Sequence, residues 1–161
     1  MDPFEILSYA VSDAAVDAAA VEGELARLEQ LAVVSAEETF GVREFISEWK
    51  LQGIPFAIVS NNSTKAIRKY INAHNLTDSI SLIAGRTPEC ADRLKPDPHL
   101  IEEALNEMNC NPQEAVFIGD SISDMIAGWR AGVVRVAFAN KTGKDATLGP
   151  LSDLVIERFG N

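Results

Sequence analysis

Apolar residues recur at helical spacing in the first third of this chain. Between residues 14 and 34 the apolar positions share one stripe, and charged residues lie off it. The stripe consists of Val21, Leu25, Leu28 and Ala32. A further helix is predicted over about 42–52, ending near Gly53, and Asp2 followed by Pro3 is a favourable start for an earlier one. The first third is therefore predicted to be helical.

From residue 53 onward, short apolar runs alternate with amphipathic segments. The apolar runs predict strands at 55–60, 81–85, 115–120 and 133–139, and a short edge strand at 153–157. The amphipathic segments predict helices at 63–75, 98–109 and 122–131. Continuous apolar strands that alternate with helices indicate a parallel sheet covered on both faces. The predicted fold class is α/β, and ligands in such folds bind at the carboxyl ends of the strands.

Polar residues follow the first of these strands. In "IVSNNS" (58–63), Ser60 ends the strand, and Asn61 leads toward the amino terminus of the next helix. A hydroxyl beside free backbone N–H groups can hold a phosphate. The alternative is that this segment only caps the helix.

A lysine and two aspartates stand at two further loop and strand ends. Lys95 in "RLKPDPH" (93–99) precedes a proline, which favours an extended backbone, so its charge can be fixed beside a phosphate or carboxylates; a solvated charge is the alternative. In "FIGDSISDMIAGWRAG" (117–132), Gly119 permits a turn, Asp120 follows the strand, and Asp124 lies one helical turn later. Two carboxylates at that spacing suit Mg²⁺. They also suit simple helix capping.

The order of these segments resembles one family. "VSNNS", "LKPDP" and "GDSISD" are similar to the second, third and fourth motifs of the haloacid dehalogenase-like hydrolases, which are mostly magnesium-dependent phosphatases. The resemblance covers about residues 40–157. It implies a three-layer, Rossmann-like parallel sheet over residues 41–161, with residues 1–40 as the remnant of a small helical cap.

The resemblance also implies roles for the site residues in phosphoryl transfer through an aspartyl-phosphate. Ser60 would hydrogen-bond the phosphoryl group, Asn61 would offer its backbone N–H, and Lys95 would pair with the phosphate. Asp120 would bind Mg²⁺ directly, and Asp124 directly or through water. The implied catalytic set is Ser60, Lys95 and Asp120, and the implied substrate is a small phosphorylated metabolite.

The first motif of the family, a strand that ends in Asp-x-Asp, does not occur in this sequence. Its first aspartate is the family's nucleophile. The aspartates before Ser60 are Asp2, Asp13 and Asp17, and none of them follows an apolar strand. The chain as it stands is therefore expected to be inactive, with weakened Mg²⁺ binding. Because the missing strand is central in the family's sheet, strands 55–60 and 115–120 must either pair directly or leave an open slot, which would favour self-association.

Three hypotheses remain open. The chain is an amino-terminally truncated phosphohydrolase, or it is a non-catalytic module that binds phosphate or a partner. The third is dehalogenase chemistry on the same scaffold. Reading the nucleotide sequence before the first codon distinguishes the first two.

Composition narrows the class of partner. The 161 residues carry a formal net charge of -10 and no long basic stripe, which disfavours nucleic acid and anionic lipid. No apolar run reaches the roughly 18 to 20 residues of a membrane span, and no secretory signal is evident at the amino terminus. Cys90 and Cys110 lack metal-ligand spacing and are typical of free thiols. A cytoplasmic protein is expected.

Some residues outside these motifs also carry predictions. Trp49 and Trp129 lie on helical faces with other apolar residues and are expected to pack in the core. Asn140 and Lys141 follow the strand at 133–139, where a surface loop is preferred over contact with substrate.

Overall fold

Three helices precede the first strand in the computed structural model, which describes residues 3–160. They are α1 (Pro3–Ser12), α2 (Ala18–Ala32) and α3 (Val42–Leu51). The helical prediction for this third is confirmed, although the expected start at Asp2 lies outside the described residues. Helix α2 begins later than residue 14 because the Asp17 side chain accepts a hydrogen bond from the Ala20 N–H at 3.0 Å, which caps the helix there.

Strands and helices then alternate as predicted. The strands are β1 (Ala57–Ser63), β2 (Leu82–Arg86), β3 (Val116–Gly119), β4 (Val134–Phe138) and β5 (Leu154–Ile156). The helices are α4 (Thr64–Ala73), α5 (His99–Glu107), α6 (Ile122–Ala131) and α7 (Lys144–Leu148). Helix α7 was not predicted, because its five residues are too few to show helical spacing.

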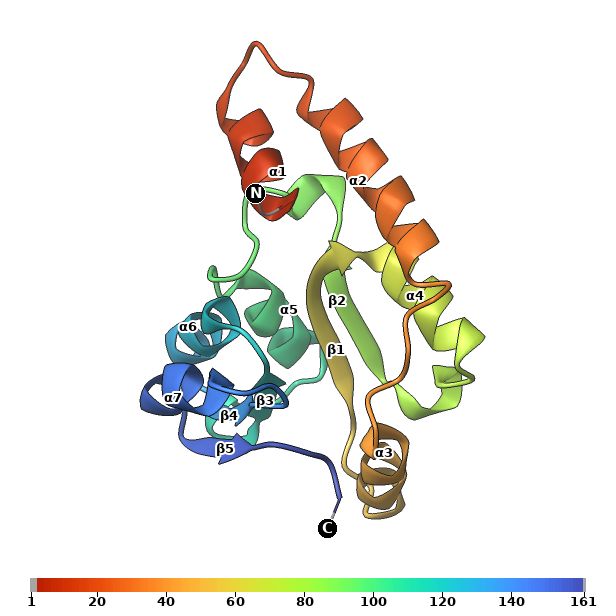
Figure 1. Ribbon diagram of the computed structural model, residues 1–161, viewed down its shortest axis with the longest axis vertical. Helices are drawn as coiled ribbons and strands as arrows, with labels where there is room; N and C mark the ends of the chain where they lie inside the picture. The colour runs from red at the N-terminus through yellow and green to blue at the C-terminus, as the bar shows by residue number, and fades with distance from the viewer. Residues whose placement is uncertain (1–2, 161) are drawn as a thin grey trace.

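All strand pairs are parallel, but the strands form two sheets. One sheet contains β1 and β2, with Val59 opposite Ala84, and the other has the order β3-β4-β5, with Ile118 opposite Val136. No pairing joins β1 to β3 within residues 3–160. Of the two expected arrangements, the structure adopts the open one, and Figure 1 shows β1 and β3 apart.

Helices cover both faces of the β1–β2 sheet (Figure 1). Ala57, Val59 and Ala84 face α5, whereas Ile58 and Ile83 face α4, as expected for strands whose side chains alternate. The prediction of an α/β fold with three layers is confirmed here.

Helix α5 is also the apolar connection between the two sheets. Its residues Ile101 and Leu105 cluster with Ala127 and Ala131 of α6, and Val59 and Phe117 pack against the same cluster. These two strand residues come from β1 and β3, which do not pair. The sheets are therefore held in place through the helix layer.

Helices α1 and α2 lie beyond the carboxyl ends of β1 and β2 (Figure 1), where a buried arginine fixes α2. Arg86 ends β2 and is 1% exposed. Its guanidinium donates to both carboxylate oxygens of Glu29, at 2.8 and 3.0 Å, and to the Asn61 carbonyl at 2.7 Å. Glu22 lies 3.4 Å from Arg86 Nε. Two carboxylates of α2 thus surround one buried cation.

The expected core positions of the two tryptophans are wrong. Trp129 is 67% exposed, and Trp49 is 37% exposed with its ring 5.6 Å from that of Phe45. On α6 it is Gly128 that faces the sheet, since a Cβ added there would lie 3.3 Å from Phe117. The residue after it therefore points outward.

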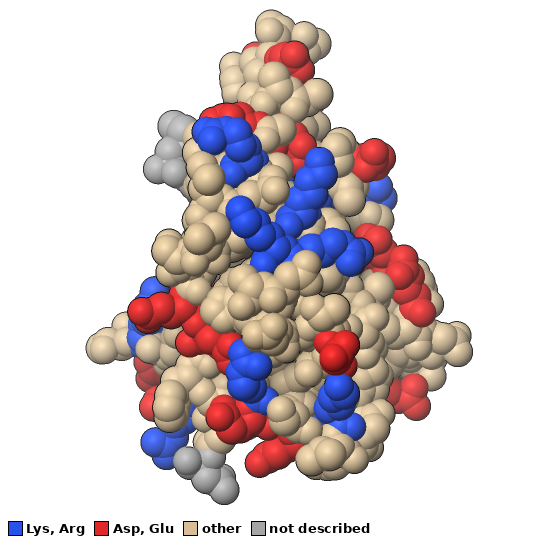
Figure 2. Space-filling model, turned by 90° about the vertical axis from the view of Figure 1, so that its right-hand side faces the viewer, with Lys and Arg blue, Asp and Glu red and all other residues tan. Residues whose placement is uncertain are grey.

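Basic side chains gather on one face of the molecule, where α2 and α4 lie (Figure 2). On α4 the exposed ones are Lys65, Arg68 and Lys69. Both cysteines are free. Among the described residues, no helix has the length and hydropathy that crossing a bilayer requires.

Candidate functional site

A cavity of about 490 Å³ lies between the two sheets. We call it the inter-sheet cavity. Ser60, Lys95, Asp120 and Asp124 all line it, so the structure brings together residues from all three predicted segments. Its other lining residues are Thr39, Ile58, Val59, Phe117, Ile118, Gly119, Phe138, Asn140 and Phe159. Polar groups thus share the cavity with apolar walls from β1 and β3.

Lys95 extends from the loop after β2 into this cavity. Its Nζ atom donates to Asp124 Oδ1 at 2.7 Å and to the Val59 carbonyl at 3.1 Å, and it lies 5.6 Å from the centre of the Phe117 ring. The side chain is 10% exposed. The alternative of a solvated surface charge is therefore wrong for this lysine.

Asn61 holds the Lys95 backbone. Its side-chain oxygen accepts from the Lys95 N–H at 2.9 Å, and its side-chain nitrogen donates to the Lys95 carbonyl at 3.1 Å. Asn61 was singled out for its backbone N–H, but the contact that the structure provides is this reciprocal pair. The sequence carries no local signal for it, because 34 positions separate the two residues.

Asp124 is both a helix cap and an ion-pair partner. Its Oδ2 atom accepts from the N–H groups of Asp120 and Ser121, at 3.1 and 3.0 Å, and from the Ser121 hydroxyl at 2.6 Å. Burial raises the pKa of this carboxyl, but the Lys95 charge and the hydrogen bonds from Lys95, Ser121 and Asp120 outweigh burial, so the pKa lies below its ordinary value. Asp124 is therefore held as a carboxylate.

Gly119 makes room for this arrangement. A Cβ at this position would lie 2.8 Å from Cγ and 3.0 Å from Oδ2 of Asp124. Glycine is needed here because the carboxylate approaches so closely. The backbone conformation does not require glycine, since Gly119 has no positive φ.

Ser60 lines the inter-sheet cavity and does not cap the following helix. The prediction that it ends its strand is wrong, because β1 continues to Ser63. The Ser60 hydroxyl oxygen accepts from the Asn62 N–H at 3.2 Å. Ser63 caps α4 instead, accepting from the Ala66 N–H at 3.3 Å. The capping alternative is therefore right for Ser63, whereas the Ser60 side chain lines the cavity.

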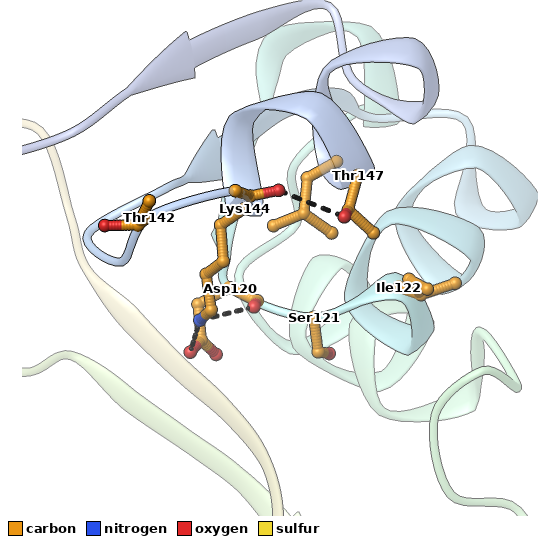
Figure 3. Close-up of a pocket in the computed structure, with 8 residues that line it drawn as sticks. Asp120, Ser121, Ile122, Thr142, Lys144 and Thr147 are labelled. Atoms are coloured by element: carbon orange, nitrogen blue, oxygen red, sulfur yellow. Dashed lines mark hydrogen bonds and ion pairs between the residues drawn. The ribbon is translucent and has the colours of Figure 1, made fainter.

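Asp120 pairs with a lysine that the sequence interpretation missed. Lys144 Nζ donates to Asp120 Oδ2 at 2.6 Å and to the Asp120 carbonyl at 2.8 Å (Figure 3). The available signal was the position of the loop after β4, because β3 and β4 are parallel and neighbouring, so their carboxyl ends meet at one edge. Asn140 and Lys141 in that loop are both exposed, as expected for a surface loop, and Asn140 also lines the inter-sheet cavity.

A second cavity, of about 380 Å³, adjoins Asp120 on the α7 side. Figure 3 shows Asp120 and Lys144 pointing toward each other at its edge. The lining includes three hydroxyl side chains, those of Ser121, Thr142 and Thr147.

The donor set suits a divalent ion through Asp120. The described residues contain no group of three or more His, Cys, Asp or Glu that could hold a metal. Mg²⁺ keeps several waters and needs only one or two carboxylates. The Asp120 side chain is 61% exposed, whereas Asp124 accepts hydrogen bonds at both oxygens. Asp120 therefore fits as a direct ligand, and Asp124 fits through water.

Comparison with known proteins agrees with the predicted motifs. Residues 22–138 match the family described as haloacid dehalogenase-like hydrolase. The bifunctional riboflavin kinase/FMN phosphatase of Arabidopsis thaliana is 27% identical over 128 residues, covering 74% of this chain and 33% of the relative. Pyrophosphatase PpaX of Bacillus thuringiensis is 27% identical over 101 residues, covering 63% of this chain and 46% of the relative.

Solved structures share the fold. A HAD-superfamily hydrolase from Ehrlichia chaffeensis superposes with a TM-score of 0.62 at 29% identity, covering 77% of this chain and 58% of that one. CbbY from Rhodobacter sphaeroides, solved with phosphate, superposes with a TM-score of 0.72 at 19% identity, covering 89% and 65%.

The chain spans about a third to a half of the length of these two curated relatives. The family match nevertheless covers most of the chain and includes the segments that carry Ser60, Lys95, Asp120 and Asp124. The chain belongs to the haloacid dehalogenase-like hydrolases.

Proposed function

We propose that this chain forms the phosphate- and magnesium-binding part of a phosphohydrolase that acts on a small phosphorylated metabolite. The observation that carries the proposal is the meeting of Ser60, Lys95, Asp120 and Asp124 at one cavity. The printed names of two relatives, an FMN phosphatase and a pyrophosphatase, support the substrate class. Residues 41–161 are the proposed core, and residues 1–40 the proposed cap remnant.

Each side chain has a part in this proposal. The Ser60 hydroxyl donates to an oxygen of the phosphoryl group, and the Lys95 ammonium neutralises its charge. Asp124 orients Lys95 through the 2.7 Å ion pair and leaves the ammonium a further N–H to donate. Asp120 holds Mg²⁺, which stabilises the negative charge that develops during phosphoryl transfer. These are positioning and electrostatic roles.

The nucleophile is the part that this sequence does not supply. Hydrolysis through an aspartyl-phosphate needs a carboxylate that attacks phosphorus, and no Asp-x-Asp strand occurs among the 161 residues. Loss of a covalent nucleophile costs about a millionfold in rate in a well-studied hydrolase. We therefore propose that these residues by themselves have little or no turnover. The facing edges of β1 and β3 would accept a strand that carries the nucleophile.

A non-catalytic binding module is the second candidate. The apolar walls of the inter-sheet cavity favour it, since Ile58, Phe117 and Ile118 line a space between unpaired strands. Such a surface would take an extended apolar strand from a partner or from a second copy of the chain. Sedimentation of the protein over a range of concentrations tests whether a second copy of the chain binds there.

Two measurements test the proposed function. Titration of inorganic phosphate in the presence of Mg²⁺, followed by ³¹P NMR, should show saturable binding that Lys95→Ala weakens at least about tenfold, because a charge-assisted contact is lost. Lys141→Ala removes the same charge from an exposed position and should leave phosphate binding unchanged. Equal effects of the two variants would contradict the phosphate site.

Hydrolysis of p-nitrophenyl phosphate by the 161-residue chain should be near background. Rapid turnover that Ser60→Ala and Asp120→Asn abolish would contradict the missing nucleophile. An Asp-x-Asp strand encoded in frame before the first codon would favour a phosphohydrolase, and a stop codon there would favour the binding module.

A further inference from the structure

Each carboxylate of the site is paired with its own lysine. Lys95 holds Asp124 at 2.7 Å, and Lys144 holds Asp120 at 2.6 Å. The first pair is buried, with side chains 10% and 8% exposed, whereas those of Lys144 and Asp120 are 23% and 61% exposed. The two pairs therefore differ in how easily they exchange partners.

Lys144 contacts Asp120 at two oxygens. The ammonium lies 2.6 Å from the carboxylate Oδ2 and 2.8 Å from the main-chain carbonyl of the same residue (Figure 3). Oxygens that converge on one point hold a compact cation, and both an ammonium and a hard divalent ion are cations of that kind. Lys144 and a divalent ion therefore compete for the same carboxylate.

The cavity beside Lys144 can accommodate its ammonium group once a divalent ion has displaced it from Asp120. The cavity of about 380 Å³ beside Lys144 carries the hydroxyls of Ser121, Thr142 and Thr147. Hydroxyl oxygens accept hydrogen bonds from an ammonium, and the lysine stem is flexible. Lys144 can therefore leave Asp120 without being buried in an apolar environment.

We propose that Lys144 is a positioning residue that competes with the divalent ion for Asp120 and thereby lowers the affinity of the site for metal. Lys144 fixes the Asp120 carboxylate in place and gives it up when the ion binds. The inference rests on the proposed function, in which Asp120 is the metal ligand, and adds a residue that the motifs of the sequence do not contain.

The test uses Mn²⁺ as the probe, with binding to the full chain followed by calorimetry and by the EPR signal of free Mn²⁺. Lys144→Ala should bind Mn²⁺ about tenfold more tightly than the unsubstituted chain, because one competing charge is removed at contact distance. Lys144→Gln should change in the same direction, and Lys144→Arg should restore the weak binding because it keeps the charge.

Lys141→Ala is the matched control, because it removes an equal charge from an exposed position in the loop just before α7. It should change the affinity by less than about twofold, as expected for a more distant, screened charge. An affinity in Lys144→Ala that equals that of the unsubstituted chain or of Lys141→Ala would overturn the proposal.

Asp120→Asn separates this proposal from the one on which it rests. If Asp120→Asn weakens Mn²⁺ binding but Lys144→Ala leaves it unchanged, the metal site stands and the competition by Lys144 is refuted. If Asp120→Asn leaves Mn²⁺ binding unchanged both in the otherwise unsubstituted chain and in the Lys144→Ala variant, both the metal site and the competition are refuted.

Discussion

The Nζ atom of Lys95 lies 2.7 Å from Oδ1 of Asp124, and this ion pair crosses from one sheet to the other. Lys95 follows β2, whereas Asp124 lies on α6, which follows β3. The same ammonium donates to the Val59 carbonyl of β1. A single lysine thus ties together segments whose strands do not pair, and its loss has consequences for both stability and binding.

Replacing Lys95 by methionine should lower the free energy of unfolding by about 3 kcal/mol, because a buried carboxylate loses its counter-charge. Urea denaturation measures the change. Lys95→Met combined with Asp124→Asn should recover part of the loss, since no unpaired charge is then buried. No recovery in the double variant would show that the pair contributes by packing alone.

Acid should weaken the fold through Asp124. The pKa of its carboxyl is lower in the folded chain than in the unfolded one, so the unfolded state binds more protons and stability falls as the pH drops. The contribution is complete above the unfolded pKa of about 4 and is lost as the pH falls through the lower folded value. Urea midpoints measured from pH 6 to pH 3 should show this decline, and Asp124→Asn should decline less.

Gly119→Ala should destabilise the chain by about 1–3 kcal/mol, because the added methyl group overlaps Asp124 and forces the capped helix to move. Gly23→Ala is the matched control. A Cβ at Gly23 would meet nothing within 4 Å, and the residue lies inside α2, so alanine should stabilise the fold by about 0.5–1 kcal/mol. Thermal melts that rank the two variants the other way would contradict this account of Gly119.

Arg86→Met should release α1 and α2 from the rest of the chain. The substitution leaves the carboxylates of Glu22 and Glu29 buried without their cation, at a cost of about 3–5 kcal/mol. Limited proteolysis should cut first between α2 and α3, and amide exchange should quicken in α2 more than in β4. Uniform exchange across both elements would show that the chain unfolds as one unit.

The succession of strands and helices along the chain was predictable because it depends on local patterns. A buried parallel strand is a continuous apolar run, and the polar residue after it marks the ligand edge, which located Asp120 directly after β3. The same rule ended the first strand too early, because β1 continues through the polar residues after Ser60 to Ser63. Long-range pairing was not predictable in the same way. The reciprocal hydrogen bonds between Asn61 and Lys95, and the contact of Lys144 with Asp120, join residues that are far apart in the sequence.

Burial of the aromatic residues also depended on tertiary packing. A stripe of apolar residues on α6 predicted a buried Trp129, but the helix buries the side that contains Gly128 and leaves Trp129 exposed. Helical spacing gives the residues of a face, whereas the neighbouring strand decides which part of that face is covered.

Phe159, which lines the inter-sheet cavity, has its ring centre 4.7 Å from that of Phe138 and 5.0 Å from that of Phe45. The carboxyl-terminal segment of the described chain therefore closes one side of the cavity and connects β4 with α3. Removing the few residues that include Phe159 would open the cavity on that side. For anyone preparing this protein, the carboxyl end is the wrong place to trim.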